Sequence, residues 1–426
     1  MSITVLFILF FVLLLAGLPV SVCLGTSSLV YLLLSDTLPT EMMIQTMVKG
    51  LDSFPLIAIP LFIFAGSLMN NSGITDRIFK FAHAVVGHWP GGLGQVNVVN
   101  SIIFSGMSGS AVADAGGIGT VEVHALTKNG YPKGFSVGLT AASSLIGPII
   151  PPSIPMVVFG VAASVSIGEL FVAGILPGLL MGIGLMIYTY IMAKKHHFPR
   201  EERTTFVNLL RSVKSAFWAL ICPLIILGGI MFGIVTPTEA AIIAVVYTLV
   251  ISFLVYRTLN FKQLIKITME SIETTVTVTF VLATSAIFAW ILTYEGIPQM
   301  LASKLISVTD NASLILLIIV VVLLILGTFM ETGALIVILV PIFMPIIQAV
   351  GIDPVHFGIV MMVALMLGMI TPPVGLVLFV LNKALKMPLE TVVRGTMSFY
   401  IPLLIVLVIL MYVPQISLLL PNLFYR

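Results

Sequence analysis

Apolar stretches of about twenty residues recur along this chain from its N-terminus to its last residues. A helix of that length crosses the ~30 Å hydrocarbon core of a bilayer. Hydrophobic residues make up 59% and charged residues only 8% of the 426 residues, whereas a soluble domain carries about 25% charged residues. No soluble fold could bury so much apolar surface. We therefore expect an all-α polytopic membrane protein surrounded by lipid.

Several functional classes are disfavoured by the composition. The formal charge of +2 is too small to indicate a nucleic-acid partner. Cys23 and Cys222 both lie in apolar stretches, where a thiol is usually a packing residue, so we expect neither a disulfide nor a metal site from them. The histidines fall mostly in expected loops or at span ends, which argues against a proton relay. The Gly-x-x-x-x-Gly-Lys-Ser/Thr phosphate loop of ATP-driven pumps is absent from the sequence.

The basic residues predict the orientation of the chain. The most basic loop, Lys194–Lys214, is placed in the cytoplasm by the positive-inside rule. Counting spans backwards puts both Arg77 and Lys128 on the same cytoplasmic side. The stretch Gln95–Thr127 between them must then enter and leave the membrane on one side. Since its centre is rich in serine and glycine, it is predicted to be a re-entrant hairpin surrounded by protein.

An internal repeat indicates two related halves. Residues 130–174 align without gaps on residues 351–395, an offset of 221 (351 minus 130). We count five crossings between the repeat starts, near Asp52 and Ser271, so the two copies should have opposite orientations in the membrane. Inverted repeats with interrupted helices are the architecture of secondary transporters. The matched pairs are Gly130 with Gly351, Gly147 with Gly368, Pro151-Pro152 with Pro372-Pro373, Glu169 with Glu390, and Gly174 with Gly395.

These patterns predict the organisation of the whole chain. The first segment, Ser2–Leu34, is too long for a signal-peptide core, so we expect one retained span that Gly17 and Pro19 break. The expected parts are residues 1–51 as an N-terminal span and connector; 52–193 as the first repeat, with a hairpin at about 95–127 and a broken helix at about 135–165; 194–270 as a cytoplasmic loop and scaffold helix pair; and 271–426 as the second repeat, with a hairpin at about 314–347, a broken helix at about 355–386 and a C-terminal span.

The breaks and the hairpin tips carry the residues that could bind a solute. Proline removes an amide donor and disfavours helix in the residue before it, so the breaks leave carbonyl groups that a desolvated cation can satisfy. Carboxylates at this depth are functional candidates by default. The alternative is that small residues merely allow close helix packing. The candidates for a solute cavity are Ser108, Asp114, Ser153, Glu331 and Thr332.

Five phrases of the sequence together resemble the large membrane subunit of the tripartite ATP-independent periplasmic (TRAP) transporters, and the resemblance covers essentially the whole chain. It implies an elevator-type mechanism and Na⁺-driven import of an organic acid, either a C4-dicarboxylate or a sialic or other sugar acid. The phrases are Asp52–Leu56 with Ala58–Pro60, His88–Gly94, Ser108–Asp114, Gly147–Pro155 and Thr236–Ala240.

The resemblance also implies ligands and partners. Na⁺ would be the coupling ion, with no other metal and no cofactor. A periplasmic binding protein would deliver the solute, and a separate, small four-span subunit would join this chain in the inner membrane of a bacterium or archaeon. The implied sodium ligands, several of them backbone carbonyl groups, are Ser105, Ser110, Gly147, Ile150 and Pro152 in the first half and Gly327, Gly368, Thr371 and Val374 in the second.

Two other classes of function remain alternatives. A passive channel or a structural membrane subunit could also contain pseudo-symmetric hairpins, but it would not need solute-sized re-entrant segments in both halves. The segment Gly106–Gly109 fits the Gly-x-Ser-Gly pattern of intramembrane serine proteases. A protease needs a base within reach of Ser108, and no histidine is expected in mid-span. We therefore expect a transporter and not an enzyme.

Overall fold

The computed structural model describes residues 3–35, 38–199, 203–309 and 311–425. Within these ranges every regular element is a helix, which confirms the predicted all-α fold class. Six of the described helices are long and apolar enough to cross a membrane. A seventh span is added if α20 (Leu389–Met397) and α21 (Tyr400–Tyr412), bent by 51° at their junction, are counted together. The chain is therefore a multi-pass membrane protein.

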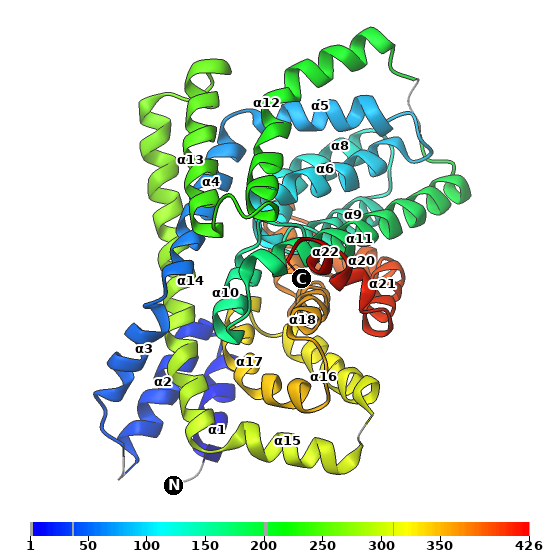
Figure 1. The fold of residues 1–426 in the computed structure, drawn as a ribbon. Coiled ribbons are helices and arrows are strands. Elements are labelled where there is room, and N and C mark those ends of the chain that lie inside the picture. Colours follow the sequence, from blue (N-terminus) through cyan, green and yellow to red (C-terminus); the bar gives the residue numbers. More distant parts are fainter. Residues whose placement is uncertain (1–2, 36–37, 200–202, 310, 426) are drawn as a thin grey trace.

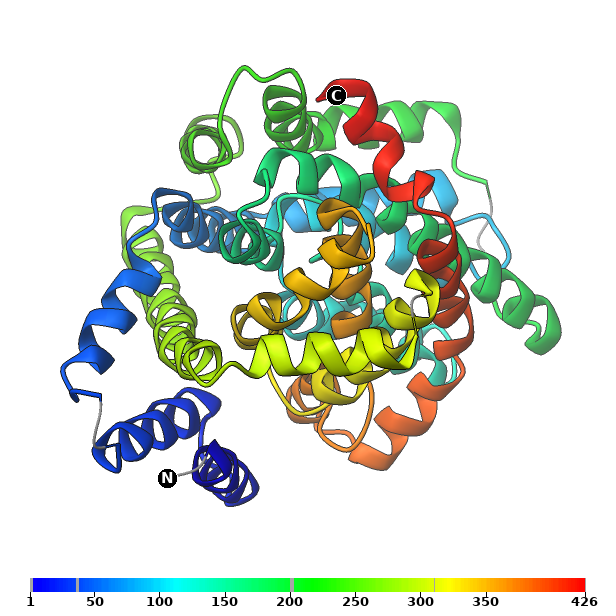
Figure 2. The same cartoon turned by 60° about the horizontal axis from the view of Figure 1, so that its bottom comes forward.

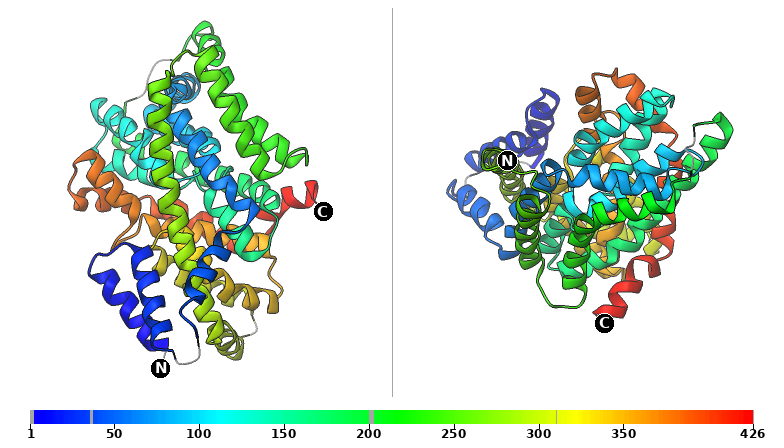
Figure 3. Two further views of the ribbon diagram at one scale, coloured as in Figure 1. Left: turned by 90° about the vertical axis from the view of Figure 1, so that its left-hand side faces the viewer. Right: turned by 90° about the horizontal axis from the view of Figure 1, so that it is seen from above.

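One side of the molecule is formed by long helices that lie next to one another. Helices α4 (Ala58–Asn71), α13 (Pro237–Val250) and α14 (Phe261–Tyr294) pack side by side, and α12 (Phe206–Met231) lies against α13 (Figure 1, Figure 3). The 34 residues of α14 make a helix about 51 Å long, longer than the hydrocarbon core is thick. A capping box starts α13, because Thr236 and Glu239 bond each other's amide groups. We call these four helices the scaffold side.

The expectation of a single broken span at the N-terminus is wrong. Helices α1 (Ile3–Leu15) and α2 (Val20–Leu33) fold back on each other as a hairpin beside α14 (Figure 2). Gly17 turns the chain with φ +82°, a left-handed value that costs glycine nothing, and Pro19 starts the second helix. The break residues were identified correctly, but they produce a reversal and not a kink. Helix α3 (Met42–Leu51) then runs along α14.

The two halves repeat one order of elements from opposite ends of the molecule. Helices α5 (Ile74–Val86) and α15 (Ile297–Val308) lie across opposite ends (Figure 1). A glycine with positive φ precedes each of them, Gly73 at +68° and Gly296 at +70°. A hairpin follows in each half, formed by α6 (Gly92–Ser108), α7 (Ala111–Gly116) and α8 (Ile118–Lys128) in the first and by α16 (Ala312–Gly327) and α17 (Thr332–Ala349) in the second. This arrangement is the inverted repeat expected from the sequence.

A broken helix follows each hairpin and forms the core. The first consists of α9 (Lys133–Ser144) and α10 (Ile154–Ala163), and the second of α18 (Pro354–Met369) and α19 (Leu376–Leu385). The peptide bonds Pro151-Pro152 and Pro372-Pro373 in the two breaks are both cis. The 12 residues of α9 span only about 18 Å, so this helix ends inside the membrane. Four further helices pack around this core. They are α11 (Ile167–His196), α20, α21 and α22 (Gln415–Phe424).

Helix α9 packs against α20 through glycines, and this contact predicts a stability effect. A β-carbon on Gly138 would lie 2.1 Å from the carbonyl oxygen of Gly395, whereas one on Gly228 of α12 would meet nothing within 4 Å. We expect Gly138→Ala to lower stability by about 1–3 kcal/mol through overpacking. Gly228→Ala should be neutral or slightly stabilising, because alanine favours helix. Thermal unfolding of both variants in detergent tests this, and equal midpoints would contradict the glycine contact.

Candidate cation and solute site

The tip of the first hairpin rests on the first helix break. Helix α6 ends at Ser108, and Gly109 turns the chain with φ +59°. Ser110 then caps α7, because its Oγ accepts a hydrogen bond from the amide of Ala113 at 3.4 Å. A β-carbon added to Gly109 would lie 2.6 Å from the carbonyl oxygen of Pro152. The backbones of tip and break therefore touch, and only glycine permits this approach.

The second half repeats this contact with different residues. A β-carbon on Gly368 would lie 2.6 Å from the backbone of Gly327, so α18 and the end of α16 also meet backbone to backbone. The amide of Gly375 donates to the carbonyl oxygen of Thr328 at 3.0 Å, which ties the far end of the break to the tip. Each half thus joins a hairpin tip to a helix break. The sequence predicted the pieces, and the structure brings them together.

Both junctions contain carbonyl groups that no described residue satisfies. A buried carbonyl group normally has a partner, so the open ones in the buried first break indicate water or an ion, whereas the second break is partly exposed. The carbonyl oxygen of Gly368 differs from the others in accepting the amide of Thr371 at 2.9 Å. Among the described residues, no hydrogen bond reaches the carbonyl oxygens of Gly147, Ile150, Pro152, Gly327, Thr371 and Val374.

Hydroxyl groups near the junctions donate to the backbone and keep lone pairs available. The hydroxyl of Ser105 is fully buried and donates to the carbonyl oxygen of Ser101. The hydroxyl of Thr371 donates to the carbonyl oxygen of Leu367 at 2.7 Å. Each hydroxyl oxygen has two lone pairs, so it can donate its proton and still accept from a donor or contact a cation. The arrangement suits an oxygen-only cation site in each half.

The two tips face each other across a small cavity of about 70 Å³. Ser110 lines it from the first tip, and Glu331 and Thr332 line it from the second. The carboxylate of Glu331 also caps α17, accepting the amide of Ala334 at 3.2 Å. The hydroxyl of Thr332 points to the sulfur of Met369 at 3.3 Å. A space of this size holds about two water molecules, so a larger solute must also use space beside it.

Two residues predicted from the sequence to line the solute cavity, Asp114 and Ser153, are not among its described lining residues. Asp114 is only 2% exposed and lies within the first half, on α7. Ser153 is fully buried, and its hydroxyl is already used by the backbone. It donates to the carbonyl oxygen of Pro148 at 2.5 Å and caps α10 by accepting the amide of Met156. Ser108 ends α6, and its side chain lies outside the described part of the chain.

Sequence analysis did not identify a buried carboxylate, Glu122. Its two oxygens accept hydrogen bonds from the side-chain amides of Asn97 at 2.6 Å and Asn100 at 2.5 Å. Asn97 also contacts the hydroxyls of Thr140 and Ser143, on α9. This network joins α6, α8 and α9 behind the first tip. The signal was the Asn-x-x-Asn spacing, which puts two amides on one face of α6 within an apolar hairpin.

Comparisons with known proteins agree with this arrangement. The family described as "Tripartite ATP-independent periplasmic transporter, DctM component" matches residues 7–416. The sialic acid TRAP transporter large permease protein SiaM of Vibrio cholerae is 44% identical over 412 residues, 97% of this chain and 96% of that protein. The C4-dicarboxylate TRAP transporter large permease protein DctM of Pseudomonas aeruginosa is 40% identical over 371 residues, 87% of each chain. Both relatives are named as permeases, not enzymes.

A solved structure shares the fold. The crystal structure of the Alcanivorax borkumensis YdaH transporter superposes with a TM-score of 0.59 and covers 96% of this chain and 97% of that one. The sequences are 16% identical, so the likeness concerns the fold alone. Because it extends over nearly the full length of both chains, it supports the arrangement of both halves and not just of one repeat.

The two hydrogen bonds of the Ser153 hydroxyl predict a structural effect. We expect Ser153→Ala to lower stability by about 1–3 kcal/mol, because α10 loses its cap and the buried carbonyl group of Pro148 loses its donor. Ser303→Ala is the matched control, since Ser303 is exposed on α15 and bonds only the carbonyl oxygen of Met300 in its own helix. Thermal unfolding of both variants measures the difference. A midpoint for Ser153→Ala equal to that of the control would show that this hydroxyl does not hold the break.

Proposed function

This chain belongs to the DctM family of tripartite ATP-independent periplasmic transporters, and we propose that it imports an organic acid by coupling it to Na⁺. The observation that carries the proposal is the pair of tip–break junctions, each with open carbonyl oxygens and neighbouring hydroxyls. A passive channel does not need a hairpin tip packed on a helix break in each half. The proposed location is the inner membrane of a bacterium or archaeon.

The proposed sodium ligands are oxygen atoms from neutral groups. In the first half they come from Ser105, Ser110 and the first break, and in the second half from the end of α16 and the second break. Na⁺ is a hard cation that prefers oxygen, and neutral carbonyl groups hold it without trapping it, as a transported ion requires. Among the described residues, no group of three or more His, Cys, Asp or Glu is placed to hold a metal ion instead. The set is Ser105, Ser110, Gly147, Ile150, Pro152, Gly327, Gly368, Thr371 and Val374.

When ionised, the carboxylate of Glu331 gives a physical reason for coupling. An anionic solute in the tip cavity would be repelled by this carboxylate, which the cap on α17 holds in place. A sodium ion at each junction would offset that repulsion and let the hydroxyls of Ser110 and Thr332 donate to the solute. Solute and ions would then bind well only together. Carrying them as one unit prevents the ions from leaking without solute.

The solute class that we propose is taken from the names of the relatives. Their names specify sialic acid and C4-dicarboxylates, which share the carboxylate group. We propose an acid of one of these kinds for this chain, delivered by a periplasmic binding protein. A small four-span subunit would pack against this chain. The hairpins and broken helices would move as a body against the scaffold side in an elevator motion.

Transport assays test the proposal directly. The chain and its small partner are placed in proteoliposomes with the binding protein outside, and uptake of labelled sialic acid and of succinate is measured with and without an inward Na⁺ gradient. We expect uptake of one acid that needs both the gradient and the binding protein. Uptake that proceeds at full rate without Na⁺ would reject the coupling ion and favour a channel.

The hydroxyls of the two junctions give a sharper prediction. Ser110→Ala and Thr371→Ala should each raise the Na⁺ concentration for half-maximal uptake by about tenfold, because a lost neutral ligand costs about 1–1.5 kcal/mol. Thr371→Ser restores the hydroxyl and should behave nearly as the native protein. Ser303→Ala, far from both junctions on α15, controls for expression. An unchanged sodium dependence in both alanine variants would remove these residues from the cation sites.

A further inference from the structure

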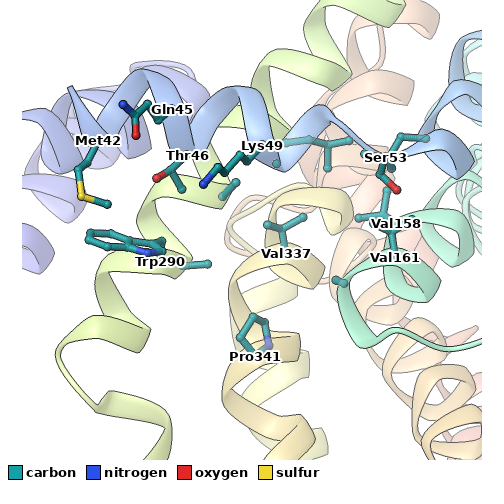
Figure 4. Close-up of a pocket in the computed structure, with 16 residues that line it drawn as sticks. Met42, Gln45, Thr46, Lys49, Ser53, Val158, Val161, Trp290, Val337 and Pro341 are labelled. Carbon is teal, nitrogen blue, oxygen red and sulfur yellow. The ribbon is translucent and has the colours of Figure 1, made fainter. Parts of the chain in front are cut away.

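A second space lies beside the tip cavity. It has a volume of about 530 Å³ and lies between α3 and α14 on one side and α10 and α17 on the other (Figure 4). Lys49, Thr46 and Gln45 line it from α3, and Trp290 lines it from α14. We call this space the α3 cleft. It is large enough for an acid that the tip cavity cannot hold.

The α3 cleft continues the tip cavity along three helices. Helices α10, α14 and α17 each line both spaces. On each helix, a residue that lines the tip cavity is followed one helical turn later by a residue that lines the cleft. Val158 lines both spaces. The three helices therefore form common walls from one space to the other. The pairs are Ile154 and Val158, Val278 and Leu282, and Gly333 and Val337.

Charge is confined to one point of the α3 cleft. Among the described residues that line it, Lys49 is the only charged one, and its side chain points into the space between α3 and α14 (Figure 4). The part next to the tip cavity is lined by Val158, Val337 and other apolar side chains, which offer an anion no binding partner. An ammonium group within such a passage attracts anions and raises their local concentration. No described carboxylate forms an ion pair with Lys49.

The position of the cleft matches the direction of import. Helix α3 lies toward the end of the molecule opposite the start of α12 (Figure 1). The basic segment predicted as the loop Lys194–Lys214 includes the end of α11 and the start of α12. That loop is cytoplasmic by the positive-inside rule. The α3 cleft therefore lies in the half of the molecule that an imported solute reaches first.

We propose that the α3 cleft is the route by which the organic acid reaches the tip cavity and that Lys49 binds its carboxylate on the way. The proposal rests on the import of an organic acid proposed above and adds a binding residue to it. Lys49 is exposed, so its hydrated ammonium group holds the anion weakly and releases it inward.

Three variants test the role of Lys49 in proteoliposomes with the small partner and the binding protein. We expect Lys49→Gln to raise the KM for the transported acid by about tenfold with little change in maximal rate. Lys49→Arg keeps the charge and should stay within about threefold of the native protein. Lys304→Gln removes the same charge from an exposed position on α15, at the same end of the molecule, and should change nothing. Added choline chloride should raise the native KM more than that of Lys49→Gln.

An anionic lipid headgroup is the competing ligand for Lys49, and vesicle composition separates the two. The assay is repeated in phosphatidylcholine alone and with phosphatidylglycerol added. A KM defect that persists in phosphatidylcholine supports the solute contact. A defect found only with phosphatidylglycerol would assign Lys49 to lipid and overturn the proposal, as would a native KM in Lys49→Gln.

A labelling assay keeps this test independent of transport. The two native cysteines, Cys23 and Cys222, are buried. A membrane-impermeant thiol reagent should therefore modify mainly the cysteine that the Lys49→Cys substitution introduces. We expect the acid to slow that modification without any ion gradient. If native protein transports neither acid, the proposed function fails, whereas unslowed modification in a transporting preparation rejects only the α3 cleft as the route.

Discussion

The need to satisfy backbone carbonyl groups inside a bilayer governs this structure. Lipid offers no hydrogen bonds, so unpaired backbone at membrane depth survives only when protein or a polar cavity surrounds it. The two broken helices meet this need by lying at the centre, where α18 is buried from Val355 to Met369. The hairpins, the scaffold side and α11 pack around the two broken helices. The first break is buried throughout, whereas Pro372 and Pro373 of the second break are exposed at the surface of the described chain.

Glycine contacts bring each break to its hairpin tip. Gly109 lies against Pro152, and Gly368 lies against Gly327, at distances that leave no room for a side chain. This direct backbone contact brings each hairpin tip against a helix break, an approach that side chains of ordinary size would prevent. Because the tips of both halves line a single cavity, a charge bound beside one tip acts on the other tip and on Glu331. The site is therefore a shared property of both halves.

Much of this arrangement could be predicted because its signals are local. Proline pairs, glycine positions and an internal repeat at an offset of 221 residues predict where helices stop, and the distribution of basic residues predicts which way they run. The same reasoning located Gly17 and Pro19 as a break but could not tell a kink from a reversal. That choice depends on whether α1 packs against α2 or continues past it, which is decided by contacts between helices and not by either helix alone.

The sequence by itself determined the membrane class, the inverted halves, the tips and the breaks, since each follows from hydropathy, parity or the loss of an amide donor. Only the tertiary structure decided which side chains face a cavity. It buries Asp114 and Ser153, joins Glu122 to Asn97 and Asn100, and aligns Lys49 with a passage to the tips. Those outcomes depend on the rotation and packing of helices far apart in the chain, and no local pattern encodes them.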